Sequence, residues 1–245
     1  MYHFYVEPEA VSENTVRITG SDVNHIKNVL RMHSGEEIMV LDGTGMEYHC
    51  EIETISDEIV AKVLEAKKTE AELSVRLLLF QGLPKKDKME LIIQKAVELG
   101  VSEIIPVLTK RTVVKLEDKK KEQKKLERWQ AIAEAAAKQS GRGIIPKVKE
   151  AVKFADAVRQ AGELDEALIP YELAEGMDEA RAYVKGLHGK KTIGIFIGPE
   201  GGFEPDEIAM AREAGIHPIT LGKRILRTET AGLCILSVIM FELEE

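Results

Sequence analysis

The chain has 245 residues, 44% of them hydrophobic, and a formal net charge of −8 at pH 7. That length and composition support a sizeable core and favour two domains over one. Only two cysteines occur, Cys50 and Cys234, which argues against a disulfide framework and a cysteine-based metal site. The first ten residues, MYHFYVEPEA, lack the basic region and apolar core of a signal peptide, so we expect a cytoplasmic protein.

The acidic total charge disfavours nucleic-acid binding, but the charge is unevenly distributed. Residues 110–128 carry nine Lys or Arg against four Asp or Glu, a local charge of +5 that leaves −13 on the remainder. A basic face of this kind can contact phosphates even on an acidic protein. A charged helix that faces only water has the same pattern, so both interpretations stay open.

Residues 1–68 are predicted to form a small β-barrel with one helix. Runs typical of strands occur at 15–18, 37–41, 48–55 and 59–64, with turn signals between them. The helix is predicted at 22–32, with its apolar face formed by Val23, Ile26, Val29 and Leu30. Residues 65–74 are polar and have no apolar period, and we place an interdomain linker at 69–74.

Residues 75–245 alternate between predicted strands and helices, as expected for an α/β domain with a parallel sheet. Strands are predicted at 75–80, 101–108, 167–171, 193–197 and 216–221, and helices at 87–99, 118–140, 154–161, 177–187, 205–215 and 231–241. The last helix is apolar on nearly every face, which predicts burial all round. It is too short to span a membrane, which takes about 20 apolar residues.

Two of these strands run into loops that contain glycine. GPEGG (198–202) follows the strand at 193–197, and Gly222 with the mixed segment KRILR (223–227) follows the strand at 216–221. Gly201 and Gly202 permit positive φ and a close approach of a ligand to the backbone. Parallel sheets bind ligands at the carboxyl ends of their strands, so the two loops together predict a pocket. GPEGG alone is equally consistent with a simple turn.

The motifs of several common enzyme classes are missing from the sequence. There is no G-x-G-x-x-G after a strand, no P-loop and no G-x-S-x-G, and the six histidines have no spacing typical of metal ligands. A pocket of glycine backbone, apolar side chains and a few charges suits a cofactor that arrives already activated.

GPEGG followed by LGKRILRTETA resembles the C-terminal signature of the bacterial 16S rRNA (uracil-N3) methyltransferases, members of the SPOUT superfamily. Further resemblance occurs in HIKNVLRM, GLPKKDKMELIIQKAVELGV and ERWQAIAEAAAKQSGR, so it covers most of the chain. One departure is Lys86, which stands where the family pattern leads us to expect Gly.

The resemblance implies a SPOUT-type parallel sheet with a C-terminal trefoil knot, preceded by a PUA-like domain, and S-adenosylmethionine (SAM) as cofactor. The knot would be built from the loops after the strands at 167–171, 193–197 and 219–221. The cofactor contacts that it implies are Tyr171, Ile197, Gly198, Pro199, Glu200, Gly201, Gly202, Leu221, Gly222, Ile225 and Leu226. A homodimer is also implied, and it would supply a partner surface for the apolar last helix.

Uracil N3 is mostly protonated at neutral pH, so methylation needs loss of the proton or stabilisation of the anion. Arg227 is the candidate for stabilising the anion, and Glu229 for accepting the proton or orienting Arg227. Arg142, from the same or the partner subunit, is a third catalytic candidate. Helix capping with a local ion pair is the structural alternative for Arg227 and Glu229.

The expected partner is ribosomal RNA or an assembled small ribosomal subunit, without a membrane or a metal. The resemblance and the basic stretch together suggest RNA contacts at His25, Lys27, Arg31, Lys110, Arg111 and Gln139. Two alternatives remain: a SPOUT methyltransferase that acts on tRNA, and a non-catalytic RNA-binding protein. Cofactor binding separates the second alternative from both enzymes.

Overall fold

The computed structural model describes residues 1–113 and 119–244, and these divide into two compact units. The first unit comprises Met1–Glu72 with Ala137–Ile145, and the second Leu73–Ala136 with Pro146–Glu245. The predicted basic stretch therefore lies partly outside the described residues. Among the described residues, no helix combines the length and the apolar character that crossing a membrane requires.

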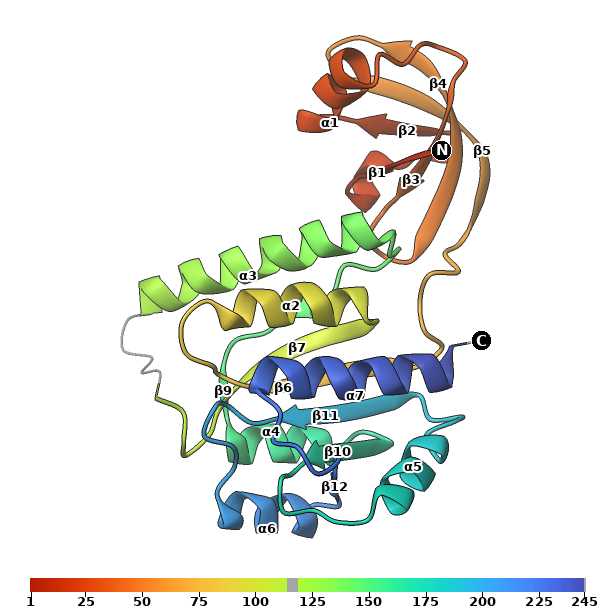
Figure 1. Ribbon diagram of the computed structural model, residues 1–245. Coiled ribbons are helices and arrows are strands. Elements are labelled where there is room, and N and C mark those ends of the chain that lie inside the picture. Colours follow the sequence, from red (N-terminus) through yellow and green to blue (C-terminus); the bar gives the residue numbers. More distant parts are fainter. Residues whose placement is uncertain (114–118, 245) are drawn as a thin grey trace. The chain divides into compact units, whose positions relative to one another are not determined.

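The first unit is built on a five-stranded sheet in the order β1-β3-β4-β5-β2, which is curled in Figure 1. Its strands are β1 (Tyr2–Tyr5), β2 (Thr15–Ile18), β3 (Glu37–Leu41), β4 (Met46–Ile55) and β5 (Ile59–Lys68). The short helix η1 (Pro8–Ala10) follows β1. β1 pairs with β3 in parallel, and the remaining pairs are antiparallel. The described residues leave β1 and β2 as two edges, so the predicted barrel is an open, curled sheet.

The helix of the first unit differs from its prediction in length and phase. α1 (Ser21–Asn24) continues as a π-turn, η2 (His25–Val29), closed by a bond from Leu30 N to His25 O of 2.9 Å. A π-turn adds one residue to the helical repeat and shifts the faces that follow it. Val29, predicted to face inward, is therefore 65% exposed. The chain leaves the helix at Arg31, which has a positive φ of 54°.

Strand boundaries in this unit follow backbone pairing more than hydrophobic pattern. β5 runs to Lys68 rather than to the predicted Leu64, because its polar end continues the ladder with Met46–His49 of β4. β1 was not predicted, since four residues with one buried pair give no clear alternation.

The second unit has an entirely parallel sheet in the order β12-β10-β11-β6-β7-β8, with β9 also paired to β7. Its strands are β6 (Arg76–Gly82), β7 (Val101–Leu108), β8 (Lys147–Val148), β9 (Val152–Lys153), β10 (Glu166–Pro170), β11 (Thr192–Ile197) and β12 (His217–Ile219). Its helices are α2 (Lys88–Glu98), α3 (Lys119–Ser140, whose last turn belongs to the first unit), α4 (Phe154–Ala161), α5 (Met177–Lys185), α6 (Pro205–Glu213) and α7 (Thr228–Leu243). The predicted α/β class is confirmed.

Helices cover both faces of this sheet, with α2 and α7 on one side and α4 and α6 on the other (Figure 1). Alternate side chains of each central strand point to opposite faces of the sheet and pack against the helices on that face. Phe80 and Phe196 stack with ring centroids 4.4 Å apart in the core cluster that includes α4 and α6. The prediction that the last helix is buried all round is wrong: Val238 and Phe241 of α7 are 46% and 83% exposed.

A carboxylate fixes the start of the central strand β11. Asp165 Oδ2 accepts hydrogen bonds from the backbone N–H groups of Lys191 (2.8 Å) and Thr192 (2.9 Å). These two backbone bonds lower the pKa of Asp165 below its ordinary value of 3.8. A lowered folded pKa means that the stabilisation is complete above the unfolded pKa and is lost as the pH falls through the folded one.

We therefore expect Asp165→Asn to lower the melting temperature at neutral pH and to reduce the loss of stability below about pH 4. Thermal melts from pH 3 to 7 measure both effects. Asp178→Asn is the control, because its carboxylate is 93% exposed and its one ion-pair partner among the described residues is Arg181 on the same helix. Equal pH dependence of wild type and Asp165→Asn would contradict this account.

Candidate active site

A pocket of about 440 Å³ lies at the carboxyl ends of the parallel strands of the second unit. Three loops line it, those after β10, β11 and β12, together with the start of α7 and Lys88 of α2. Its volume falls within the roughly 300–1,000 Å³ typical of small-molecule sites. Its position at the ends of adjacent parallel strands is where open α/β sheets bind their ligands.

The structure brings all eleven residues predicted to contact the cofactor, and Arg227, around this one pocket. Several further residues line the pocket but were not predicted from the sequence: Lys88, Pro170, Glu172, Phe203, Arg224, Thr228 and Ala231. Most of these are neighbours of predicted residues. Lys88 is the exception, because it lies far earlier in the chain and reaches the site only through the pairing of β6 with β11.

Gly201 and Gly202 of the GPEGG loop are required for two different reasons. Gly202 has a φ of +69°, which side chains disfavour. Gly201 has no positive φ, contrary to the expectation for both glycines; its constraint is space, because an added Cβ would lie 3.0 Å from Cβ of Arg111. The N–H of Gly202 donates to the Pro199 carbonyl at 2.9 Å, which closes the turn.

Thr228, which lines the pocket, forms hydrogen bonds that connect three elements of the second unit. Its hydroxyl donates to the carbonyl of Gly198 at 2.6 Å and accepts from Nε2 of Gln81 at 2.9 Å. β6, the loop after β11 and α7 are thus joined by one buried hydroxyl. The N-cap of α7 is Arg227, whose side chain makes no capping hydrogen bond.

We expect Thr228→Val to destabilise the second unit. Valine removes both hydrogen bonds and leaves the Gly198 carbonyl without its donor, a loss of about 1–3 kcal/mol for a buried group. Urea unfolding measures the change, and Thr230→Val is the control because Thr230 is exposed on the same helix. Equal unfolding midpoints for the two variants would exclude this role of the hydroxyl.

A lysine links two carboxylates beside the pocket. Nζ of Lys88 lies 3.2 Å from Oε2 of Glu229 and 3.2 Å from Oε1 of Glu200. Hydrogen bonding to Glu229, and then to Glu200, raises the pKa of Lys88. Although burial opposes it, hydrogen bonding from backbone N–H groups and from Lys88 holds the pKa of Glu200 below its ordinary value. Among the described residues, Glu229 therefore pairs with Lys88 rather than with Arg227.

The loop before α2 contacts the GPEGG loop directly. The N–H of Lys85 donates to Glu200 Oε1 at 3.1 Å, and Lys86 has a φ of +57°. A lysine in the left-handed region is strained by roughly 1–2 kcal/mol. This conformation explains why glycine suits the position where Lys86 stands.

Four predicted RNA contacts lie in the first unit and are exposed: His25, Lys27, Arg31 and Gln139. The His25 ring packs edge-on to Phe4, with centroids 6.3 Å apart, and Lys27 Nζ donates to the Ser56 carbonyl at 2.9 Å.

Arg142 also belongs to the first unit, and only 3% of it is exposed. Its Nη2 lies 2.5 Å from Oε2 of Glu72, and its carbonyl accepts a hydrogen bond from the hydroxyl of Tyr5. Arg142 does not line the pocket. Its observed contacts support the fold of the first unit, and its role in catalysis stays a prediction.

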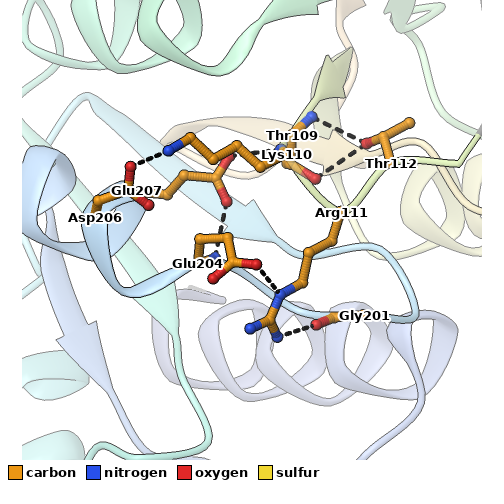
Figure 2. A network of polar contacts seen from close by, with 8 residues as sticks. All are labelled: Thr109, Lys110, Arg111, Thr112, Gly201, Glu204, Asp206 and Glu207. Atoms are coloured by element: carbon orange, nitrogen blue, oxygen red, sulfur yellow. Dashed lines mark hydrogen bonds and ion pairs between the residues drawn. The ribbon is translucent and has the colours of Figure 1, made fainter.

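The two remaining RNA candidates, Lys110 and Arg111, lie in the second unit and have acidic partners. Lys110 pairs with Asp206, and Arg111 Nε lies 2.8 Å from Glu204 Oε1, both in the region where α6 begins (Figure 2). Acidic residues of the same chain thus neutralise much of the positive charge of Lys110 and Arg111.

Comparison with known proteins agrees with this architecture. A family model described as an RNA methyltransferase domain matches residues 71–240, and one described as an RNA methyltransferase PUA domain matches residues 18–74. The chain is 39% identical to the ribosomal RNA small subunit methyltransferase E of Bacillus subtilis, over 94% of this chain and 91% of that one. The chain belongs to the ribosomal RNA small subunit methyltransferase E family.

Two further members of the methyltransferase E family extend the comparison. The protein of Synechocystis is 34% identical, over 99% of this chain and 78% of its own. The crystal structure of the Neisseria gonorrhoeae protein, bound to SAM, superposes with a TM-score of 0.81 at 34% identity, covering 98% of this chain and 97% of that one.

Proposed function

We propose that this protein transfers the methyl group of SAM to N3 of a uridine in the 16S rRNA of the small ribosomal subunit. The observation that carries the proposal is the pocket of the second unit, which gathers the GPEGG loop, the Gly222 loop and the first turn of α7. The SAM-bound structure of the N. gonorrhoeae family member supports the choice of cofactor.

The lining of the pocket fits SAM chemically. Ile197, Leu221 and Leu226 supply apolar walls suited to adenine. Glu172 and Glu200 are carboxylates suited to ribose hydroxyls and to the positive sulfonium, and Arg224 suits the carboxylate of the methionine part. When bound, SAM supplies a methyl group that its sulfonium has already activated, so the protein has to orient the acceptor and manage one proton.

Three side chains would perform the acceptor chemistry. Arg227 lines the pocket and is exposed, and its guanidinium makes no ion pair with the other described residues, so it can stabilise the negative charge on a uracil oxygen. Glu229, in the first turn of α7, would take the N3 proton. Lys88 holds the carboxylate of Glu229 at 3.2 Å and so keeps it in place.

Further parts of the proposal rest on the family. We assign residues 1–68 to a PUA-like RNA-binding domain, 69–74 to a linker and 75–245 to a SPOUT methyltransferase domain whose C-terminal segment forms a trefoil knot. His25, Lys27, Arg31 and Gln139, exposed in the first unit, would contact the RNA. The protein would work in the cytoplasm, on naked rRNA or on an assembled small subunit.

We also propose that the protein acts as a homodimer. Val238 and Phe241 leave an apolar strip of α7 exposed, and Leu91 of the neighbouring α2 is 45% exposed. A second copy would cover these side chains, and a partner subunit would be the source of an additional arginine if Arg142 acts in trans.

Methyl transfer to defined RNAs tests the substrate. The purified protein would be incubated with methyl-labelled SAM and small subunits, naked 16S rRNA or bulk tRNA. Since a methyl group on N3 blocks base pairing, reverse transcription should stop at one uridine of the 16S rRNA. Labelling of tRNA alone would favour the tRNA alternative, and no labelling of any RNA would favour a non-catalytic RNA-binding protein.

A further inference from the structure

The loop after β7 forms a hydrogen-bonded turn that faces the start of α6 (Figure 2). Thr112 Oγ1 accepts from the N–H of Thr109 at 2.9 Å and lies 3.0 Å from its hydroxyl, and Thr112 N donates back to the Thr109 carbonyl at 3.1 Å (Figure 2). This reciprocal bonding fixes the two residues between the threonines, Lys110 and Arg111.

A buried carboxylate joins this turn to α6. Glu207 is 3% exposed, and its Oε1 accepts from the N–H of Lys110 at 2.9 Å while its Oε2 accepts from the N–H of Glu204 at 2.9 Å. Glu204 and Glu207 form the capping box of the helix. The cap of α6 and the turn after β7 therefore hold each other in position.

Arg111 connects the turn after β7 and the cap of α6 to the GPEGG loop. Its Nε donates to Glu204 Oε1 at 2.8 Å, and its Nη1 donates to the Gly201 carbonyl at 2.6 Å (Figure 2). The peptide between Gly201 and Gly202 is thus held at both ends, since its N–H is bonded to the Pro199 carbonyl. Arg111 does not line the pocket, so it acts on the loop from outside the cofactor site.

We propose that Arg111 is a positioning residue that presets the GPEGG loop for SAM, rather than an RNA contact. A loop already held in its binding conformation loses less conformational entropy when it binds a ligand, which raises affinity without direct contact. Glu204 contributes by orienting the guanidinium of Arg111. This role of Arg111 rests on the proposed use of SAM as cofactor.

Calorimetric titration with SAM, in the absence of RNA, tests the proposal on wild type, Arg111→Ala and Arg111→Lys. We expect Arg111→Ala to weaken SAM binding by about 10- to 100-fold, the effect of losing one or two charge-assisted hydrogen bonds. Arg111→Lys should bind with intermediate affinity, because one ammonium can restore one bond. In steady-state assays the KM for SAM should rise while kcat at saturating SAM changes little.

Arg76→Ala is the matched control. Arg76 also forms an ion pair, at 2.6 Å with Glu103, but it lies at the amino end of β6, away from the pocket. Its variant should bind SAM like wild type. If Arg111→Ala does not fold, judged by circular dichroism, Arg111→Lys and Glu204→Gln replace it, and both should weaken SAM binding.

Unchanged SAM affinity in the folded Arg111 variants would overturn the proposal, and weaker binding of 16S rRNA in the same variants would restore the RNA interpretation. Absence of SAM binding by the wild type would instead overturn the proposed function itself.

Discussion

Arg227→Ala is expected to lower the rate of methyl transfer by about 10²- to 10³-fold, the usual effect of removing one group that stabilises a developing oxyanion. The fold should survive, because Arg227 is exposed and forms no ion pair with the other described residues. Single-turnover methylation of 16S rRNA at saturating SAM measures the effect on the chemical step.

Lys223→Ala is the control for Arg227, since Lys223 is an exposed cation of the same loop that does not line the pocket. Its variant should keep a rate close to that of wild type if the loss in Arg227→Ala is specific. Full activity of Arg227→Ala would remove this arginine from the mechanism.

Glu229→Gln is expected to lower the same rate by about 10²- to 10⁴-fold, the usual contribution of a positioned general base. Glutamine keeps the size of the side chain but cannot accept the proton. It also loses the charge that pairs with Lys88 at 3.2 Å, so the contribution of that ion pair has to be measured separately.

Lys88→Met provides that separation, because it leaves the Glu229 carboxylate in place without its cation. We expect a smaller loss of rate than for Glu229→Gln if the carboxylate itself takes the proton. Glu213→Gln, an exposed change on α6, controls for the loss of a negative charge. Equal rates for wild type and Glu229→Gln would leave the proton to another acceptor.

The hydrophobic pattern predicted the second unit well, because buried parallel strands and amphipathic helices differ clearly in length and period. β7 at Val101–Leu108 and α4 at Phe154–Ala161 begin and end where the pattern placed them. The pattern was less informative where backbone pairing or an irregular turn decides the structure. The parallel strand β1 and the π-turn that exposes Val29 are two examples.

In the candidate site too, some residues could be predicted from the sequence and others could not. Residues in loops that directly follow strands could be placed around a pocket, because the ends of parallel strands meet at one edge of the sheet. Lys88 and Arg111 could not, since their roles depend on contacts with Glu229 and Gly201 that are distant in sequence. The basic stretch and the family resemblance suggested that Arg111 binds RNA, whereas its observed partners are a carboxylate and a carbonyl of the chain.

Calorimetric titration of the wild type and of Gly201→Val with SAM shows whether the GPEGG pocket binds the cofactor. We expect saturable binding by the wild type and its loss in Gly201→Val, because a Cβ at this position would lie 3.0 Å from Cβ of Arg111. Gly162→Val, on an exposed helix end without positive φ, should bind normally. No binding of SAM by the wild type, with or without 16S rRNA, would exclude this pocket as a SAM site.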